Sequence, residues 1–239
     1  MKALYSLAVF LPLIGALAAG FGNRRLGDRG AQIVTSGGLI LAAIISIVAF
    51  IDVALGHNPD RAVLFRWIES GNFDAAWILR FDTLSVVMMC VVTIVSACVH
   101  VYSIGYMSHD HSKPRFMAYL SLFTFSMLML VTADNLVQMF FGWEGVGVCS
   151  YLLIGFWFDR PAANAAAMKA FIVNRVGDFG FALGIFGIFL LFETVSFGSI
   201  FSAVPQYTEA RLQFLGMDLP ALEILCLLLF IGAMGKSAQ

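Results

Sequence analysis

Seven apolar segments, each about as long as a membrane-spanning helix, follow one another along this chain. A helix needs roughly 20 residues to cross a hydrocarbon core of about 30 Å. Backbone polar groups cannot stay unpaired in lipid, so segments of this kind fold as helices. We therefore predict an all-α membrane protein, a polytopic helical bundle with about seven transmembrane helices, at residues 4–20, 32–51, 82–103, 116–132, 135–158, 168–192 and from about Leu219 onward.

The composition supports this class and argues against others. Of the 239 residues, 60% are hydrophobic and 12% are charged, whereas a soluble domain carries about 25% charged residues. The formal net charge of -1 gives no indication of nucleic-acid binding. The four cysteines lie in apolar segments without a Cys-x-x-Cys motif, so we interpret them as small buried hydrophobic residues rather than disulfides or metal ligands. These cysteines are Cys90, Cys98, Cys149 and Cys226.

Basic residues set the predicted orientation. Arg24, Arg25 and Arg29 directly follow the first segment, and a cluster of this kind holds its loop in the cytoplasm. We therefore interpret the first segment as an uncleaved helix with its N-terminus outside, rather than as a signal peptide. Further basic residues would lie on the same inner side: Lys113, Arg115, Arg160 and Lys169.

The chain divides into two predicted parts. Residues 1–104 form an N-terminal three-helix region with an outer loop or hairpin at about residues 53–81. In that loop, the apolar stretches around Trp67 and Trp77 suggest short strands with both indoles at headgroup level. Residues 105–239 hold the fourth to seventh helices.

Local signals predict where turns and helix ends lie. Gly71-Asn72 suits a turn inside the outer loop. A very short turn joins the fourth and fifth helices, where Asp134 or Asn135 is a natural N-cap. Two more acidic residues are interpreted as caps at outer helix ends: Asp82 and Glu193.

Three charged residues in the fifth and sixth segments indicate charge transport. A charge at the bilayer centre costs roughly 2.5–3.5 kcal/mol, so such residues are usually paired and functional. Glu144 lies about nine residues from the outer turn, or roughly 13 Å along the helix and close to the midplane. Its alternative role is to lock two helices together through one hydrogen bond. Arg175 and Asp178 share one helical face at i and i+3, either as a self-neutralising ion pair or as a proton relay.

Lys236 lies in the seventh segment beside two glycines, Gly232 and Gly235. Glycine weakens a helix, and a glycine-interrupted membrane helix is typical of a broken helix that lines a cavity. A break would hold Lys236 deep in the membrane, whereas a straight helix would place it near the inner boundary as a snorkelling lysine. A deep Lys236 could form a switchable pair with Glu144, because burial and a nearby carboxylate move the lysine pKa in opposite directions.

Other titratable groups give weaker signals. His109 and His111 lie in a short inner loop, where a lone His-x-His is more often solvated than metal-bound. His100 lies near the inner end of the third segment, and Glu223 lies one turn into the seventh. The sequence contains no Walker loop, dinucleotide fingerprint, haem motif or iron–sulfur spacing.

Four blocks of sequence resemble a known family. Residues 141–157 (FGWEGVGVCSYLLIGFW) are similar to the fifth helix of subunit L of bacterial proton-pumping NADH:quinone oxidoreductase, respiratory complex I. Residues 174–180 (NRVGDFG) resemble the sixth helix of that subunit. Residues 232–239 (GAMGKSAQ) resemble the start of its seventh-helix segment, and residues 101–107 (VYSIGYM) resemble the end of its third helix.

This resemblance implies an antiporter-like fold of two inverted repeats, each with a broken helix. It implies that this chain holds the first repeat, truncated inside a broken seventh helix. It further implies that Glu144 and Lys236 form part of a proton half-channel, with Arg175 and Asp178 beside them. The expected partners are other membrane-arm subunits of complex I and the lipid bilayer, in a bacterial inner (plasma) membrane. The resemblance implies no cofactor in this chain and no direct NADH binding, because NAD, FMN, iron–sulfur clusters and quinone belong to partner subunits.

Two other functions remain open at this point. The large subunit of a multisubunit sodium/proton antiporter carries comparable Glu and Lys positions. A purely structural membrane scaffold, with its buried charges acting between helices, is an alternative of another class.

Overall fold

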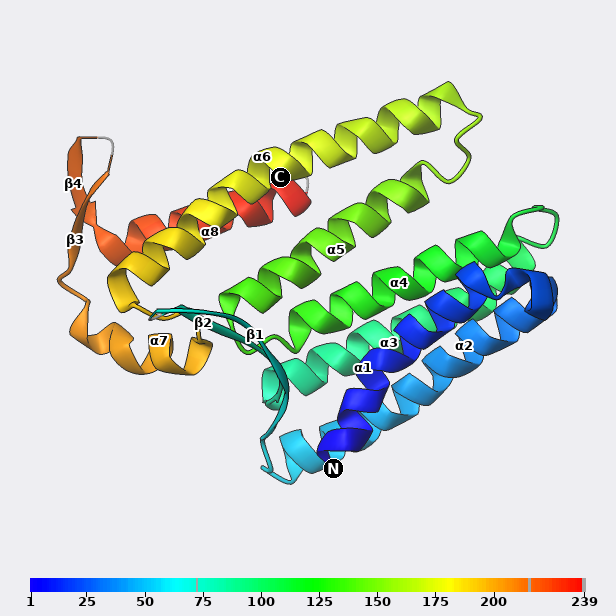
Figure 1. Cartoon of the computed structure of the whole chain (residues 1–239), viewed down its shortest axis with the longest axis horizontal. Helices are drawn as coiled ribbons and strands as arrows, with labels where there is room; N and C mark the ends of the chain where they lie inside the picture. Colours follow the sequence, from blue (N-terminus) through cyan, green and yellow to red (C-terminus); the bar gives the residue numbers. More distant parts are fainter. Residues whose placement is uncertain (72, 215, 238–239) are drawn as a thin grey trace.

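Six long helices form the body of the protein, and the computed structural model describes residues 1–71, 73–214 and 216–237. The helices lie roughly parallel to one another (Figure 1). Each is long and apolar enough to cross a membrane, which confirms the first six predicted spans as helices. They are α1 (Lys2–Phe21), α2 (Asn23–Ala49), α3 (Thr83–Tyr106), α4 (Lys113–Val131), α5 (Leu136–Ile154) and α6 (Pro161–Phe192).

Two of these helices depart from the predicted bounds for visible reasons. The α2 helix begins at Asn23 but is kinked at Gly27, whose φ of 62° is open mainly to glycine. It then continues into a π-helical turn, η1 (Phe50–Leu55). The α6 helix begins at Pro161, about two turns before the predicted start, because proline fits the first turn of a helix.

Short elements connect α6 to the last helix, α8 (Ala221–Lys236). With 16 residues, α8 rises only about 24 Å and is shorter than the six long helices. It is helical through Gly232 and Gly235 and ends at Lys236, so these two glycines do not interrupt the helix. A break of the seventh helix beyond Ser237 lies outside the described residues. The connecting elements are α7 (Phe197–Ala203), η2 (Val204–Gln206), β3 (Arg211–Phe214) and β4 (Met217–Pro220).

The predicted caps are confirmed at three helix ends. The Asp82 carboxylate accepts a hydrogen bond from the Ser85 N–H and begins α3. Asn135 does the same for α5 by accepting from the Gln138 N–H at 2.8 Å. Glu193 ends α6 in the left-handed conformation, with a φ of 55°.

The outer loop is an antiparallel hairpin of β1 (Asp60–Ser70) and β2 (Phe73–Phe81), as predicted. Gly71 has the positive φ of a turn residue, while Asn72, the other predicted turn residue, lies outside the described residues. Trp67 and Trp77 pack edge to face at 5.4 Å between ring centroids. The hairpin runs from the N-terminal helices across the helix ends toward α7 (Figure 1).

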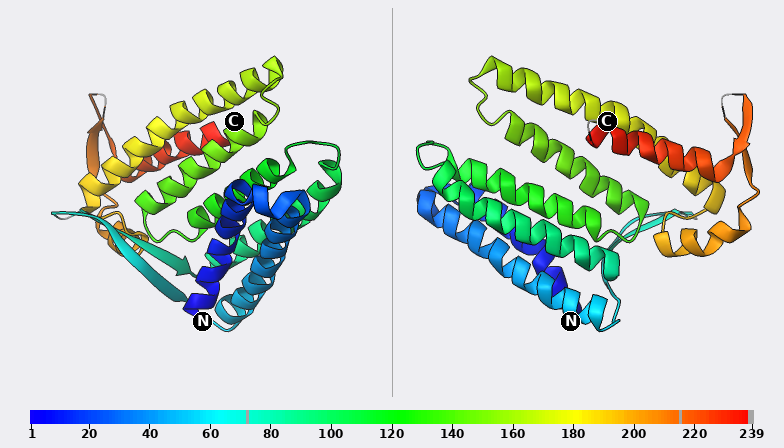
Figure 2. Two further views of the ribbon diagram at one scale, coloured as in Figure 1. Left: turned by 45° about the vertical axis from the view of Figure 1, so that its right-hand side comes forward. Right: turned by 180° about the vertical axis from the view of Figure 1, so that it is seen from behind.

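The helices form two packed groups. Both views in Figure 2 show α1–α4 gathered on one side and α6 with α8 on the other, with α5 between them. The helix α4 packs against α1, α2 and α3, and α5 joins the groups through its contacts with α4 and α6. The first group encloses one apolar cluster, which includes Tyr5, Leu79, Phe81, Met89 and Leu128. The second group encloses another, which includes Leu136, Phe181, Ile185, Ile188 and Leu225.

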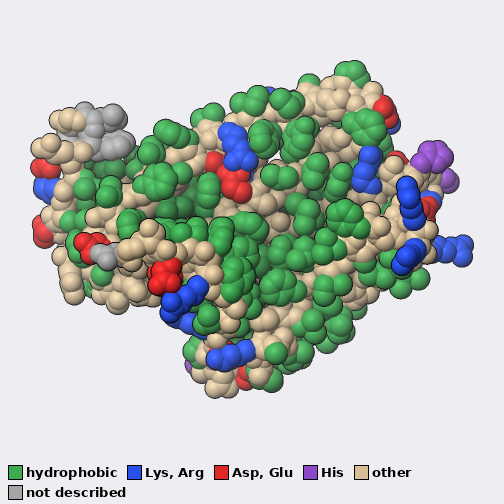
Figure 3. Space-filling view, viewed as in Figure 1, with side chains coloured by type: hydrophobic (Ala, Val, Ile, Leu, Met, Phe, Trp, Pro, Cys, Tyr) green, Lys and Arg blue, Asp and Glu red, His purple; other side chains and the backbone are tan. Residues whose placement is uncertain are grey.

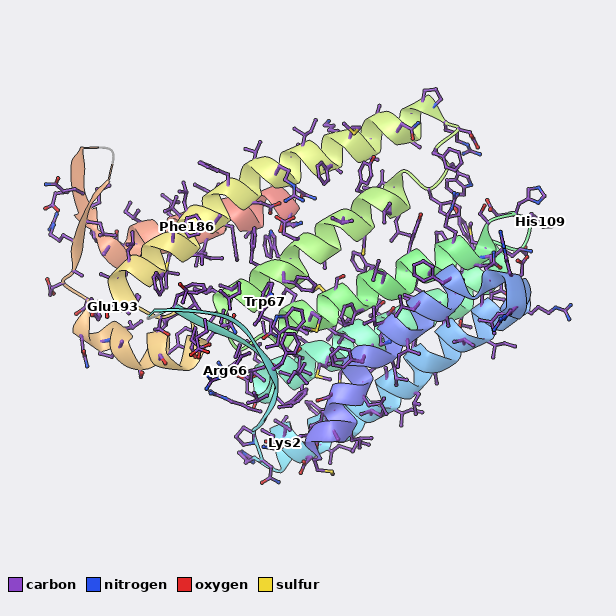
Figure 4. All side chains as sticks on the ribbon, viewed as in Figure 1. Lys2, Arg66, Trp67, His109, Phe186 and Glu193 are labelled. Carbon is purple, nitrogen blue, oxygen red and sulfur yellow. The ribbon has the colours of Figure 1, made fainter. Side chains whose placement is uncertain are left out.

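The outer surface of the helices is mostly hydrophobic, as contact with lipid requires. Hydrophobic side chains cover most of the face in Figure 3, while many charged side chains lie toward its edges. Figure 4 shows Lys2, Arg66, Trp67 and Glu193 toward one end of the helices and His109 at the other. Large apolar side chains on the outward faces of the helices are exposed, for example Leu190 at 81%. The protein is therefore a multi-pass membrane protein with polar ends.

Candidate functional site

The predicted charges of α5 and α6 form one cluster within the membrane-spanning helices. The Arg175 guanidinium Nη1 lies 2.5 Å from Glu144 Oε2 and 3.7 Å from Asp178 Oδ2. The first contact joins two helices, whereas the second is the intrahelical i,i+3 pair that the sequence indicates. Arg175 also lies over the Phe171 ring, at 4.8 Å from the ring centroid. One guanidinium therefore contacts both carboxylates of the site.

Asp178 is the most buried of these groups. Its side chain is 5% exposed, compared with 21% for Glu144 and 44% for Arg175. Asp178 Oδ1 accepts a hydrogen bond of 2.7 Å from the indole Nε1 of Trp143, one residue before Glu144 on α5. An indole N–H in a membrane core needs such an acceptor. The two helices are thus joined twice, by an ion pair and by a hydrogen bond.

Lys236 reaches the same site from α8. Its Nζ lies 5.6 Å from the centroid of the Trp143 ring, a cation–π distance. It also lies so close to the backbone of Gly147 on α5 that a side chain at that position would collide with it. Trp143 therefore presents its face to Lys236 and its N–H edge to Asp178.

Glycines bring α8 close to α6 and explain the position of Lys236. A Cβ on Gly235 would lie 3.0 Å from the Cα of Gly177, and a Cβ on Gly232 would lie 2.6 Å from the Cβ of Phe181. Small residues let membrane helices approach in this way. The glycines of the seventh segment therefore place Lys236 in the site by close packing, rather than by interrupting the helix.

The partner of Glu144 differs from the one that the sequence suggested. Within the described part of the chain, Glu144 is ion-paired with Arg175, and no ion pair joins it to Lys236. Three buried polar atoms at the site have no hydrogen-bond partner among the described residues: Glu144 Oε1, Asp178 Oδ2 and Lys236 Nζ. Buried polar groups are normally satisfied by protein or by ordered water. The site therefore offers one donor and two acceptors in the interior of the helix group.

Trp143 is the residue that sequence reasoning missed. It contacts two of the predicted charged residues. In the sequence it does not stand out, because the chain also contains 23 Phe, 6 Tyr and three other Trp residues. One signal could have identified it. Unlike phenylalanine, a tryptophan deep in a membrane helix carries a donor that must be paired, and Glu144 beside it marks a polar position.

The histidines are not brought to this site. Both His100 ring nitrogens have partners between α3 and α4, namely the Ser96 carbonyl oxygen at 2.8 Å from Nδ1 and Ser121 Oγ at 2.9 Å from Nε2. Among the described residues, no three His, Cys, Asp or Glu side chains are grouped as metal ligands would be. Nothing in the described site resembles a cradle for a cofactor.

Comparison with known proteins places this arrangement in a family. A family model described as NADH:quinone oxidoreductase/Mrp antiporter matches residues 133–239, which include the whole charged cluster. A second, the N-terminus of chain 5 of NADH-ubiquinone oxidoreductase (complex I), matches residues 67–117. The solved Mrp complex from Dietzia sp. DQ12-45-1b has a similar fold, with a TM-score of 0.78 at 21% identity, over 100% of this chain and 24% of that one. The archaeal membrane-bound sulfane sulfur reductase also gives a TM-score of 0.78, at 15% identity, over 96% of this chain and 44% of that one.

Curated relatives are more similar in sequence. NADH-quinone oxidoreductase subunit L of Rhodobacter capsulatus is 54% identical over 98% of this chain and 34% of the relative. NADH-ubiquinone oxidoreductase chain 5 of Marchantia polymorpha is 54% identical over 99% of this chain and 36% of the relative. The chain thus spans about a third of the length of these relatives. On this sequence similarity, together with the shared fold, the chain belongs to the antiporter-like family of membrane subunits that includes subunit L and chain 5 of NADH:quinone oxidoreductase.

Proposed function

We propose that this chain is part of a proton-translocating membrane subunit of NADH:quinone oxidoreductase. The observation that carries the proposal is the cluster of Glu144, Arg175, Asp178 and Lys236, in which three buried polar atoms have no partner in the part of the chain that the structure describes. Charged groups within membrane helices mark ion and proton pathways. The 54% identity to subunit L supports the choice of complex.

The proposed transfer step uses Lys236 and Glu144. The ammonium of Lys236 gives a proton to the carboxylate of Glu144, which leaves a neutral amine and a neutral carboxylic acid. The unpartnered Glu144 Oε1 and Lys236 Nζ are the atoms available for this transfer, through water if they do not meet directly. Through this transfer, Glu144 and Lys236 would form part of a proton half-channel.

Arg175 would act as the switch between two carboxylates. An arginine guanidinium keeps its protons in proteins, so Arg175 can only redistribute its hydrogen bonds. When Glu144 is ionised, the guanidinium holds it at 2.5 Å, while Asp178 lies at 3.7 Å. Protonation of Glu144 would weaken the first contact and let Arg175 move toward Asp178. Asp178 would thereby keep a counter-charge in both states.

The partners, the membrane, the location of the cofactors and the division of the chain are proposed from the similarity to subunit L. The partners are other membrane-arm subunits and the bilayer, and the membrane is the bacterial inner membrane with the N-terminus outside. The cofactors of the enzyme (NAD, FMN, iron–sulfur clusters and quinone) would lie in partner subunits. The division of the chain at residues 104 and 105 into a three-helix region and the first antiporter-like repeat also stays a prediction.

A sodium/proton antiporter subunit is the nearest alternative. The matching family model is named for both protein classes, and the fold of the Mrp complex is shared. The identity of 21% to that complex compares with 54% to subunit L, so we favour NADH:quinone oxidoreductase.

The test is Glu144→Gln in the full-length subunit, assembled in its complex and reconstituted into vesicles. NADH oxidation and proton uptake are recorded together. We expect assembly to persist and proton uptake to fall, because glutamine keeps the shape of the side chain but cannot exchange a proton. Glu193→Gln, at an exposed helix end, is the matched control and should match wild type. If Glu144→Gln also matches wild type in assembly, oxidation and uptake, the buried charges are a scaffold and the proposal fails.

A further inference from the structure

A second polar site lies at the ends of α4, α5 and α6 that are predicted to face the cytoplasm, away from the charged cluster. A cavity of about 250 Å³ opens there between Arg115 and Tyr119 of α4, Tyr151 of α5 and the start of α6. Tyr119 lies one helical turn after Arg115, so both side chains share a face of α4. We infer that this cavity binds the phosphodiester of an anionic phospholipid from the inner leaflet.

The Arg115 guanidinium has an unused donor. Its Nη2 donates to the carbonyl oxygen of Phe156 at 3.0 Å, whereas its buried Nε has no hydrogen-bond partner. The rings of Phe156 and Phe158 lie 4.6 and 5.1 Å from the guanidinium carbon and fix its plane. Leaving a buried donor of a charged group unpaired is costly. The guanidinium therefore keeps hydrogen-bonding capacity that no described residue uses.

Two hydroxyls can complete the set of donors. Among the described residues, neither the Tyr119 nor the Tyr151 hydroxyl is hydrogen-bonded to the protein, and both side chains line the cavity. Arg115, Tyr119 and Tyr151 together offer donors from two helices to one anion. Charge-assisted hydrogen bonds from arginine to phosphate oxygens are among the strongest in proteins.

A nearby acid, Asp110, does not occupy this position. Both carboxylate oxygens of Asp110 are already bonded, one to the Ser112 N–H at 2.7 Å and the other to Trp157 Nε1 at 3.0 Å. No ion pair joins Arg115 to a carboxylate in the part of the chain that the structure describes. The charge of Arg115 is therefore available to an external anion.

The surroundings favour a lipid over a free phosphate ion. The cavity is at the inner helix ends, where aromatic side chains mark the membrane interface. Beside it, Phe158 is 57% exposed and Met168 is 50% exposed, which provides apolar surface for acyl chains. Basic pockets between membrane helices on the cytoplasmic side bind anionic headgroups. This inference is independent of the proposed proton transfer.

The test measures retained lipid on the full-length protein, purified in detergent after incubation with mixed phosphatidylcholine and phosphatidylglycerol. Mass spectrometry of extracted lipid should show retained phosphatidylglycerol on wild type and about tenfold less on Arg115→Gln, since one charge-assisted donor group is lost. Arg160→Gln is the matched control, because Arg160 stacks on Trp157 at 5.1 Å and does not line the cavity. It should retain phosphatidylglycerol as wild type does.

A second variant keeps the test decisive if Arg115→Gln does not fold. Tyr119→Phe combined with Tyr151→Phe removes only two hydroxyls and should lower retention severalfold. Equal retention by wild type and whichever of these variants folds would overturn the inference. Displacement of the bound lipid by inorganic phosphate at equal concentration would also overturn it, because the site would then select a free anion. Retention of phosphatidylcholine in equal measure would show that the anionic charge is not recognised.

Discussion

The two helix groups differ in the kind of polar side chain that each one buries. In α1–α4, most buried hydroxyls donate to the carbonyl oxygen four residues earlier, while those of Tyr5 and Ser121 bond to other side chains. Among the described buried atoms of these helices, Ser36 Oγ and Arg115 Nε have no hydrogen-bond partner. Four of the hydroxyl–carbonyl pairs are Thr35 with Ala31, Ser46 with Ala42, Thr93 with Met89, and Thr132 with Leu128. In α5, α6 and α8, two carboxylates and one ammonium each keep an unpartnered atom.

His100 and Lys236 show this difference most clearly. Each is a titratable group inside a membrane helix, yet both nitrogens of His100 have partners and the nitrogen of Lys236 has none. A satisfied group in a low-dielectric interior holds its neighbours in place, whereas an unsatisfied one is costly and available for transfer. We therefore expect α1–α4 to give stability and the second group to give function.

The largest effect should come from Lys236→Met. Methionine can lie against Trp143 but carries no proton, so we expect proton uptake by the assembled complex to fall about tenfold or more, as when a proton-transfer group is removed. Proton uptake per NADH oxidised, measured in reconstituted vesicles, gives the readout. Lys169→Met, at an exposed position on α6, is the control and should leave uptake unchanged.

Wild-type proton uptake by the Lys236→Met protein would contradict the assignment of function to the second helix group. The unpartnered Nζ would then be a structural defect without a role. Loss of uptake in Lys169→Met as well would point to general damage from removing a lysine of this helix group.

His100→Ala should produce the opposite result. Removing the ring leaves Ser121 Oγ without its partner and opens a cavity, so we expect the free energy of unfolding to fall by about 2–4 kcal/mol. Proton uptake per folded complex should stay at the wild-type level. Thermal unfolding in detergent, combined with uptake in vesicles, checks both expectations. Ser103→Ala removes only a hydroxyl bonded to Val99 in its own helix and should change stability much less.

A loss of uptake in His100→Ala that exceeds the loss of folded protein would contradict the division of roles. His100 would then belong to a proton path in the first group, despite its two hydrogen bonds.

Helix positions were predictable from the sequence because each depends on a local property. Apolar length gave the six long helices, and the cap residues Asp82 and Asn135 marked where two of them begin. The charged members of the site were also predictable, because each interrupts an apolar segment. Their pairing was not, since Arg175 could reach Asp178 within its own helix and the contact with Glu144 depends on how α5 packs on α6.

The role of the glycines shows why pairing needed the structure. Gly232 and Gly235 suggested a broken helix, because glycine has a low helix propensity. In the structure their missing side chains accommodate Phe181 and Gly177 of α6. A propensity describes one helix alone, whereas the packing of two helices decides what a glycine does in a membrane.

Gly142→Ala tests this packing between the two groups. A Cβ at Gly142 would lie 2.6 Å from the backbone nitrogen of Leu130, so α5 would have to move away from α4. We expect a loss of about 1–3 kcal/mol in the free energy of unfolding. Gly37→Ala is the matched control, because nothing lies within 4 Å of its added Cβ. It should stabilise α2 by up to about 1 kcal/mol. Equal stability changes for the two variants, measured by thermal unfolding, would show that α4 and α5 are not tightly joined.

The smallest expected effect is on the pH dependence of stability, and it differs between the two ends of α4. Burial raises the pKa of Asp134 above its ordinary value of 3.8, and Asp82 nearby raises it further, while Arg61 and Arg80 act in the opposite direction. At the other end, the Ser112 N–H and then the Trp157 indole hold the pKa of Asp110 below 3.8, helped by His111 and Arg115.

These shifts give opposite dependences of stability on pH. The folded protein binds a proton at Asp134 more readily than the unfolded chain does, so the contribution of Asp134 is full below pH 3.8 and is lost as the pH rises through the folded pKa. The contribution of Asp110 is present above pH 3.8 and is lost as the pH falls through its lowered pKa. Thermal unfolding across this pH range should therefore show Asp134→Asn gaining stability relative to wild type as the pH rises, and Asp110→Asn losing it. Differences of the same sign for both variants would mean that the turn between α4 and α5 leaves Asp134 open to solvent. The junction of the two helix groups would then be looser than its buried carboxylate indicates.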